Sequence, residues 1–265
     1  MPTLPTITKR QDYILQLLYD YRFLNRTQIQ AFLGHKDKRA TNDMLKALRD
    51  TRYIEGTYST KFGENTHPAI YYASLGAIHY FKTARYAQAS VINRLYRDNT
   101  RSQDFINRCM LVADIELELQ RAKTDLLRYE LATPSMYANP ESGAHFLEAS
   151  TLTPDALIVE DSSGTYTAYM LEVLTRGMPA HRLHGKINAC LDLYYSGDWE
   201  ANTDLDFPEI LLVSSSTSQL RDARRYLQFR LAQENDAEDF KISFMTVSRL
   251  KAIGICEYLE QRKTL

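Results

Sequence analysis

Apolar residues recur with helical spacing over the first part of the chain. A capping pair, Thr8 with Gln11, precedes one apolar series, and a second pair, Asn25 with Gln28, precedes another. The two series predict a helix that ends near residue 21 and a shorter helix after it. Glycine tolerates the left-handed conformation that ends many helices, so Gly34 is the predicted stop of the second helix.

A third apolar series, at 44–48, is surrounded by lysine and arginine, which predicts a third helix that is apolar inside and cationic outside. Alternation at 53–58 and again at 70–73, on either side of a turn-rich segment, predicts a β-hairpin. Ser74 then caps another helix, expected to reach about residue 86. Three helices followed by a hairpin are the order of a winged helix-turn-helix, whose third helix enters the major groove while the wing contacts the backbone.

This architecture selects candidate DNA contacts. Thr41 and Asn42 stand near the start of the third helix, where side chains reach base edges, and Lys38 and Arg39 are placed for phosphate or guanine. Lys61, at the wing tip, is a candidate backbone contact. The other cationic candidates are Arg26, Lys46 and Arg49. A winged helix that binds only protein is the alternative, but such a module has no need of a cationic third helix.

Charge is divided unevenly along the chain. Residues 1–101 contain 16 Lys and Arg against 8 Asp and Glu, so the totals of 32 and 33 leave 16 and 25 for residues 102–265. A positive surplus on a short module is expected of a surface that meets a polyanion, because each neutralised phosphate releases counterions. Scattered, solvated basic residues give the same count, so the charge supports DNA binding only together with the architecture.

From residue 103 the pattern changes to one long helix followed by strands and helices. The helix is expected over 103–123, with Glu116 inside its apolar arc. Predicted strands are 127–132, 156–159, 165–173, 209–213 and 241–247, and predicted helices are 179–195, 218–233 and 249–262. This order predicts a mixed sheet covered by helices on both faces. We therefore expect an α/β protein, with a winged helix over 1–96, a linker over 97–102 and an α/β domain over 103–265.

Two carboxylates belong to the hairpin expected between residues 155 and 173. With its turn centred near residue 162, Asp155 faces Tyr169 or Met170, and Glu172 lies diagonally from it, within ~7–8 Å at the backbone. Two such carboxylates can share one Mg²⁺ ion. The simpler interpretation is that Asp155 caps the strand entry and Glu172 lies at the surface.

The succession Pro154-Asp155, hairpin, Glu172 and helix resembles the PD-(D/E)XK restriction-endonuclease-like fold. The resemblance implies that Asp155 and Glu172 are metal ligands, with Glu116 as a third, and that Mg²⁺ is the cofactor of a DNA nuclease. Leu174 stands where the catalytic lysine of that fold is expected, so Lys186 on the following helix would have to replace it. Otherwise the fold is present without hydrolysis.

Over almost its whole length the chain resembles the replication-relaxation family of plasmid, phage and integrated mobile elements. The segments that carry this resemblance are Arg10-Gln11, Tyr21-Arg22-Phe23-Leu24, Pro154-Asp155-Ala156-Leu157, Leu171-Glu172-Val173, Lys186 and Tyr194-Tyr195. It implies DNA handling in the replication of a mobile element or in the control of that replication.

Two functions follow from these patterns. The first is a DNA-binding protein that reads double-stranded DNA with its winged helix, while the α/β domain is a scaffold for a homodimer or for another replication or mobile-element protein. The second is a Mg²⁺-dependent nuclease or nickase that uses Asp155, Glu172 and Lys186, with Glu116 as a further ligand. Because Leu174 stands where the catalytic lysine is expected, we place the first function ahead of the second. Without hydrolysis, no cofactor is expected.

Other classes of protein are not supported. No stretch approaches the ~20 apolar residues that cross a bilayer, and residues 1–10 lack the apolar segment of a secretory signal. We therefore expect a cytoplasmic protein without a membrane partner. The sequence also lacks a Gly-rich loop followed by Lys and Ser or Thr, so ATP hydrolysis is not supported.

Overall fold

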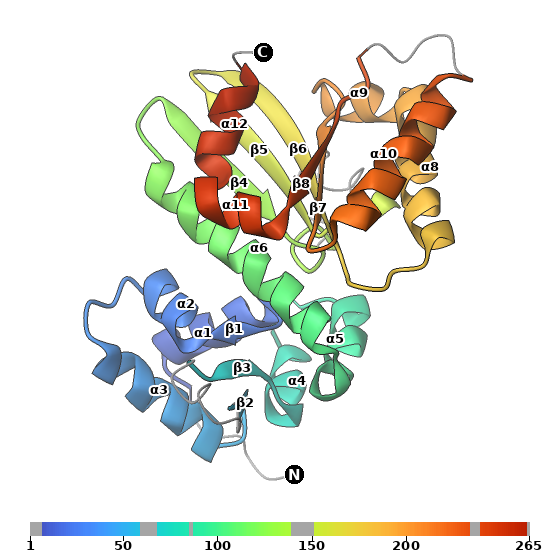
Figure 1. Cartoon of the computed structure of the whole chain (residues 1–265). Coiled ribbons are helices and arrows are strands. Elements are labelled where there is room, and N and C mark those ends of the chain that lie inside the picture. The colour runs from blue at the N-terminus through green and yellow to red at the C-terminus, as the bar shows by residue number, and fades with distance from the viewer. Residues whose placement is uncertain (1–6, 59–67, 85–86, 139–150, 234–238, 264–265) are drawn as a thin grey trace. The chain divides into compact units, whose positions relative to one another are not determined.

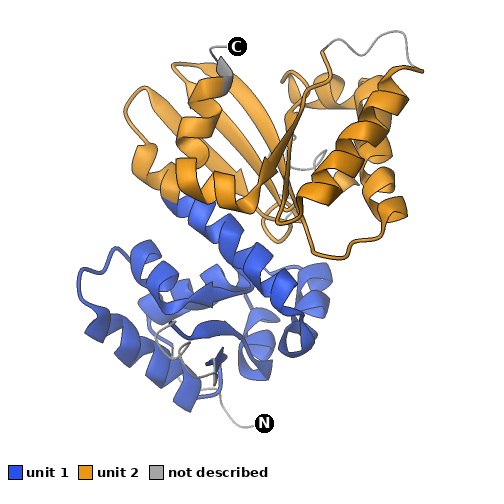
Figure 2. Ribbon diagram, viewed as in Figure 1, with its two compact units in different colours: residues 1–117 blue, residues 118–265 orange. Residues whose placement is uncertain are grey.

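The computed structural model describes residues 7–58, 68–84, 87–138, 151–233 and 239–263 (Figure 1). The chain forms two compact units, residues 1–117 and 118–265 (Figure 2). The division falls within one long helix, α6 (Gln103–Ala122).

The N-terminal unit combines helices with a three-stranded antiparallel sheet. Its elements before α6 are α1 (Lys9–Tyr21), β1 (Leu24–Asn25), α2 (Arg26–Phe32), α3 (Lys38–Asp50), β2 (Ile54–Thr57), β3 (Ile70–Ala73), α4 (Leu75–Phe81), α5 (Ala89–Leu95) and the 3₁₀ helix η1 (Asp98–Thr100). The sheet order is β1-β3-β2, so β3 lies between the other two strands. The three predicted helices and both predicted strands are therefore present in the expected order.

Local capping explains why these helices begin where they do. Thr8 and Gln11 form a complete capping box at α1, and Asn25 and Gln28 form another at α2, as predicted. Ser74 caps α4, but that helix ends at Phe81 and so is shorter than expected. The short strand β1 was not predicted, because two residues are too few to show a period.

The segment 97–102, expected as a linker, contains η1 and packs within the N-terminal unit. Asp98 is only 2% exposed and forms an ion pair with Arg22 at the end of α1. The domain limits drawn from the sequence stay a prediction.

The C-terminal unit is built on a five-stranded mixed sheet. Its elements are β4 (Leu127–Ala132), β5 (Ala156–Ser162), β6 (Thr165–Leu174), α8 (Ala180–Ser196), α9 (Asp198–Thr203), β7 (Glu209–Ser214), α10 (Thr217–Leu231), β8 (Ile242–Thr246), α11 (Val247–Ile253) and α12 (Ile255–Lys263). The order is β4-β5-β6-β7-β8; the first three strands are antiparallel, whereas β6, β7 and β8 run parallel. The predicted α/β architecture is confirmed.

Both faces of this sheet are covered by helices, as predicted. Alternate strand residues such as Leu157, Met170 and Leu212 form a buried core with α8 and α10. On the other face, α11 and α12 cover the intervening strand residues. One helix was expected here, but Gly254, with a φ of +82°, separates α11 from α12. The short helix α9, which carries the buried Trp199, was not predicted.

Candidate nucleic-acid interface and carboxylate site

The exposed face of α3 carries the predicted cationic residues. Asn42, Lys46 and Arg49 are exposed and follow one another at intervals of four and three, so they lie on one stripe of the helix. Lys38 and Arg39 are exposed at its first turn. The adjacent stripe of the helix, Thr41, Leu45 and Leu48, is buried in the core of the unit. The helix is therefore amphipathic as predicted, with its cationic side open to a ligand.

A pocket of about 340 Å³ lies beside this stripe. Residues from α2, α3, the strand β3 and the segments next to β2 and β3 line it together: Arg26, Asn42, Asp43, Leu45, Lys46, Arg49, Tyr58, Ala69 and Tyr71. Three cations against one carboxylate, Asp43, make the pocket positive. We refer to it below as the α3 pocket.

Tyrosine hydroxyls connect α3 to the hairpin inside this pocket. An N–H of the Arg49 guanidinium donates to the Tyr58 hydroxyl at 2.9 Å. Burial, followed by a hydrogen bond with Tyr58, raises the pKa of Tyr71 to about 12, and the charges of Arg49 and Arg26 oppose that rise. The Tyr71 phenol is therefore neutral at ordinary pH and remains available for hydrogen bonds, while Tyr58 is 57% exposed.

Three of the predicted contacts need separate comment. Thr41 is fully buried, and its hydroxyl contacts Nδ1 of His35 at 3.0 Å, so its side chain does not face a ligand and we leave it out of the interface. Arg26 donates to Oε1 of Gln30 at 3.0 Å, which orients its guanidinium at the start of α2. Lys61 lies outside the described residues. Tyr58 and Tyr71 were missed, because only the strand register shows that they meet α3.

The three predicted catalytic residues of the C-terminal unit gather at one end of its sheet. Lys186 on α8 donates to both carboxylate oxygens of Glu172 on β6, with Nζ–Oε1 and Nζ–Oε2 distances of 2.7 and 2.8 Å. Asp155 accepts the backbone N–H of Val173 through Oδ2 at 2.8 Å. The Glu172 side chain is 8% exposed and that of Lys186 is 33% exposed, so the ion pair is partly buried rather than at the surface.

The hairpin register differs from the expected one. The turn is formed by Ser163 and Gly164, both with positive φ, rather than centred at residue 162. Ala156 pairs with Leu171, and the backbone N–H of Asp155 donates to the carbonyl of Leu171. The register therefore continues with Asp155 directly across from Glu172, not diagonally from it, which brings the two residues closer than predicted.

On the side of the core, the ion pair has apolar neighbours. Burial and then the charge of Glu172 raise the pKa of Cys190 to about 12, which places this thiol next to the carboxylate. Leu174, at the position expected for a catalytic lysine, is 3% exposed and belongs to the core beneath α8. In the described part of the chain, no group of three or more His, Cys, Asp or Glu side chains is arranged to hold a metal ion.

Glu116, the predicted third ligand, belongs to the N-terminal unit and is buried within it. Its charge contributes to raising the pKa of Tyr13 and of Tyr21, after the larger effect of burial, so Glu116 lies near both phenols. Its role as a metal ligand stays a prediction.

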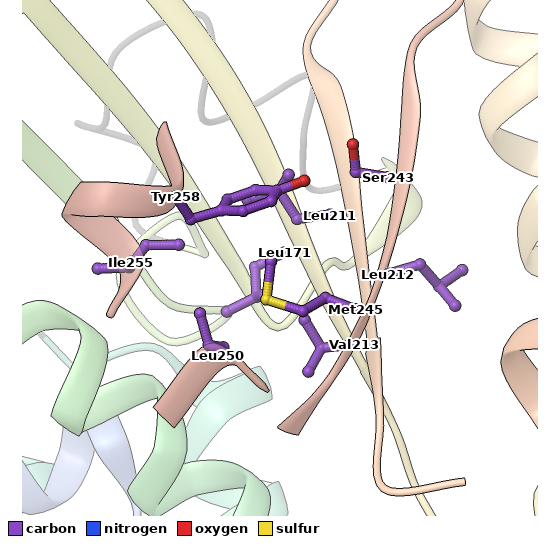
Figure 3. Close-up of a pocket in the computed structure, with 9 residues that line it drawn as sticks. All are labelled: Leu171, Leu211, Leu212, Val213, Ser243, Met245, Leu250, Ile255 and Tyr258. Atoms are coloured by element: carbon purple, nitrogen blue, oxygen red, sulfur yellow. The ribbon is translucent and has the colours of Figure 1, made fainter. Parts of the chain in front are cut away.

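A further pocket lies beneath α11 and α12 (Figure 3). It is lined by Leu171, Leu211, Leu212, Val213, Ser243, Met245, Leu250, Ile255 and Tyr258. Its volume of about 10 Å³ is close to that of a single water-sized probe, so this pocket is part of the apolar core rather than a ligand site.

Comparison with known proteins gives one family match that covers parts of both units. The model of the replication-relaxation family matches residues 15–210, a span that contains the whole of α3 and also Asp155, Glu172 and Lys186. The chain belongs to the replication-relaxation family. Membership in this family associates it with replication or relaxation of mobile elements. No curated protein and no solved structure gave a match. Within the described residues, no helix is long and apolar enough to span a bilayer.

Proposed function

We propose that this member of the replication-relaxation family binds duplex DNA through its N-terminal unit and acts in the replication of a mobile element or in its control. In this proposal the unit is a winged helix. The helix α3 enters the major groove, and the strands β2 and β3 belong to the wing.

The α3 pocket is the observation that carries the proposal. Arg26, Lys46 and Arg49 come from two different helices, yet they converge on one concavity that the hairpin closes. Scattered surface cations have no reason to converge in this way. Guanidinium and ammonium groups grouped around tyrosine hydroxyls match a sugar–phosphate backbone, because each phosphate offers acceptor oxygens and a full negative charge.

In this proposal, the cationic side chains of the α3 pocket and the amide of Asn42 have different roles. Lys46 and Arg49 bind phosphate and account for affinity and its salt dependence. Asn42 is the side chain on this stripe suited to read a base edge, because an amide can donate and accept at adenine. Lys38 and Arg39 extend the same cationic side toward the first turn of α3.

Salt-dependent binding to duplex DNA tests the proposal. Lys46→Gln with Arg49→Gln should lower affinity and reduce the log–log salt slope by about two units, one for each phosphate that the protein no longer neutralises. The matched control is Lys9→Gln with Arg10→Gln, which removes the same charge from exposed positions at the start of α1. An unchanged slope in the α3 variant, or an equal change in the control, would contradict the role of the pocket.

We assign the C-terminal unit the role of a scaffold for a homodimer or for another replication protein. Light scattering of the full chain, alone and with DNA, tests the dimer. A monomer in both conditions would remove self-association from the proposal.

The contact between Lys186 and Glu172 supports a second candidate function, a Mg²⁺-dependent DNA nuclease of the PD-(D/E)XK type. Lys186 on α8 contacts the Glu172 carboxylate, although Leu174, at the usual position of the catalytic lysine, is part of the core. Asp155 and Glu172 would be the protein ligands, and Mg²⁺ commonly needs only one or two carboxylates besides water and phosphate. When bound, the ion would activate water and neutralise the scissile phosphate.

Incubation with supercoiled plasmid and Mg²⁺ or Mn²⁺ tests this second candidate. Metal-dependent nicking that is lost in Asp155→Asn, and retained in the control Glu130→Gln at an exposed position of β4, would support a nuclease. Absence of cutting by the wild-type protein at concentrations that bind DNA would remove the candidate.

A further inference from the structure

The outer side of α10 carries arginine residues that belong to neither site described above. Arg221, Arg224 and Arg225 are exposed on this helix, and so is Phe229 one turn after Arg225. We refer to these four residues as the α10 face. We propose that the α10 face binds single-stranded DNA, with its arginines on phosphates and Phe229 stacked on a base. This function goes beyond the scaffold role of the C-terminal unit, and it does not depend on the α3 pocket.

The spacing of the four residues places them on one side of the helix. Arg221, Arg225 and Phe229 follow one another at intervals of four, so each lies next to the one before it and about 6 Å further along the helix axis. Arg224 lies beside this row, three residues after Arg221. The buried residues of α10 pack against the sheet and α8 instead, so the α10 face is open to a ligand.

The other charged residues of α10 are engaged by α8. Oδ2 of Asp222 lies 3.3 Å from Nε2 of His184, whose ring stacks on that of Tyr226. Arg230 donates to Oδ1 of Asn188 at 2.7 Å. Asp222 is the single carboxylate in the sequence of α10, and it contacts α8 rather than the arginines of the α10 face.

The three arginines of the α10 face have no acidic partner. Within the described part of the chain, no ion pair or hydrogen bond engages their guanidinium groups. The guanidinium carbon of Arg224 lies 5.2 Å from the centroid of the Phe244 ring on β8, a cation–π contact that orients the side chain without neutralising it. Residues 102–265 contain 25 Asp and Glu against 16 Lys and Arg, so acidic side chains are plentiful in this part of the sequence. Three neighbouring arginines without one therefore form a local positive surface.

Phosphate is the anion that suits this surface. A guanidinium group presents several N–H donors in a fixed fork, which matches the oxygens of a phosphate, and it also stacks on flat rings such as bases. Side chains that follow one another along a helix can contact successive phosphates of one strand. The α10 face therefore fits a nucleic-acid backbone that runs along the helix.

Phe229 favours a single strand over a duplex. It is 59% exposed, which alone needs no explanation, because isolated apolar residues are common at protein surfaces. Here, however, the ring lies on the same side of the helix as the arginines. The bases of a duplex stack on one another and do not reach such a ring, whereas the bases of a single strand can stack on it while their backbone contacts the arginines.

Fluorescence anisotropy with the full-length protein tests this proposal. The probes are a labelled DNA single strand of mixed sequence and the duplex of the same sequence, each titrated at several salt concentrations. Arg221→Gln with Arg225→Gln should weaken binding to the single strand and reduce its log–log salt slope by about 1.4, because each phosphate contact to a single strand contributes about 0.7. The matched control, Arg249→Gln with Lys251→Gln, removes the same charge from exposed positions of α11 on the other face of the sheet and should leave that slope unchanged.

Substitution of Phe229 gives a signature that charge alone does not produce. Phe229→Leu keeps an apolar side chain but removes the ring, so affinity for the single strand should fall about five-fold while the salt slope stays the same. Phe229→Tyr retains the ring and should bind as the wild type does. Circular dichroism checks that each variant is folded. If the double arginine variant is not, Arg225→Gln alone should reduce the slope by about 0.7.

The outcomes separate this proposal from duplex binding at the α3 pocket. A wild-type protein that binds the duplex but not the single strand would overturn the α10 face and leave the α3 pocket standing. An unchanged slope in the arginine variant, or equal affinity of Phe229→Leu and wild type, would also overturn it. Tighter binding to the RNA strand of the same sequence, or to poly-glutamate, would assign the surface to another partner. If Lys46→Gln with Arg49→Gln binds the duplex normally while the α10 variants lose the single strand, the α3 pocket fails and the α10 face stands.

Discussion

Removal of the Lys186 amine should destabilise the C-terminal unit far more than removal of an exposed charge on the same helix. Lys186→Met keeps the length of the side chain but leaves the Glu172 carboxylate, 8% exposed, without the ammonium group that contacts both of its oxygens. Breaking a buried pair in this way costs about 3–5 kcal/mol. Because a third of Lys186 is open to solvent, we expect a value at the low end, about 3 kcal/mol.

The chain contains a built-in reporter for this measurement. Trp199 is its single tryptophan, it is fully buried, and it belongs to the same unit as the ion pair. Urea unfolding followed by tryptophan emission therefore reports the C-terminal unit. The matched control is Arg182→Met, one turn earlier on α8 at an exposed position, which should change stability by no more than ~0.5 kcal/mol.

A double-mutant cycle separates the ion pair from a simple change in packing. Glu172→Gln combined with Lys186→Met removes both charges, so the double variant should be more stable than the sum of the single effects predicts, by about 2 kcal/mol. Additive effects, or a Lys186→Met cost no larger than that of Arg182→Met, would refute the view that the buried carboxylate depends on this lysine.

Three further predictions concern the N-terminal unit. Thr41→Ala should cost about 1–2 kcal/mol in thermal unfolding, because His35 is left without the threonine hydroxyl, while DNA affinity and sequence preference equal to those of the wild type would support its absence from the interface. Gly76→Ala should destabilise by more than ~2 kcal/mol, because the added Cβ overlaps the backbone carbonyl of Arg52; an unchanged melting temperature would contradict this. Burial raises the pKa of Asp20 from 3.8 to about 7. The proton bound to Asp20 therefore stabilises the folded state fully below the unfolded-state pKa of 3.8, and this stabilisation is lost as the pH rises to about 7. Asp20→Asn should therefore gain stability relative to wild type between pH 4 and pH 7, and a constant difference across that window would refute the assignment.

Much of the N-terminal fold could be predicted from local signals. The pairs Thr8–Gln11 and Asn25–Gln28 satisfy orphan backbone groups within a single turn, so they require no knowledge of distant residues. The buried face of α3 could also have been predicted from the sequence. Thr41 stands four residues before Leu45 and seven before Leu48, which is the spacing of the buried stripe, and this spacing is the better guide than nearness to the helix start.

Other features of the sites depend on long-range pairing. Tyr58 and Tyr71 meet α3 only because Gly56 pairs with Tyr71 across the sheet, and the sequence contains no local signal for that register. The hairpin at Asp155 shows the same difficulty on a smaller scale. Its polar segment 160–164 allows several turn positions, and only the two positive φ values at Ser163 and Gly164 select one. A shift of two or three residues in the expected pairing was enough to misplace Asp155 relative to Glu172.

The lysine at the carboxylate site illustrates how such long-range geometry changes a functional argument. Alternation along β6 places Met170, Glu172 and Leu174 on the face that packs beneath α8. Leu174 fills the core there, and Lys186 on the covering helix α8 contacts Glu172 instead. The same amine can serve either a structural ion pair or phosphate chemistry, because both need a positive charge beside a carboxylate. Stability of the Lys186 and Glu172 variants measures the first role, and plasmid cutting by the Asp155 variant measures the second, so the two roles can be assigned independently.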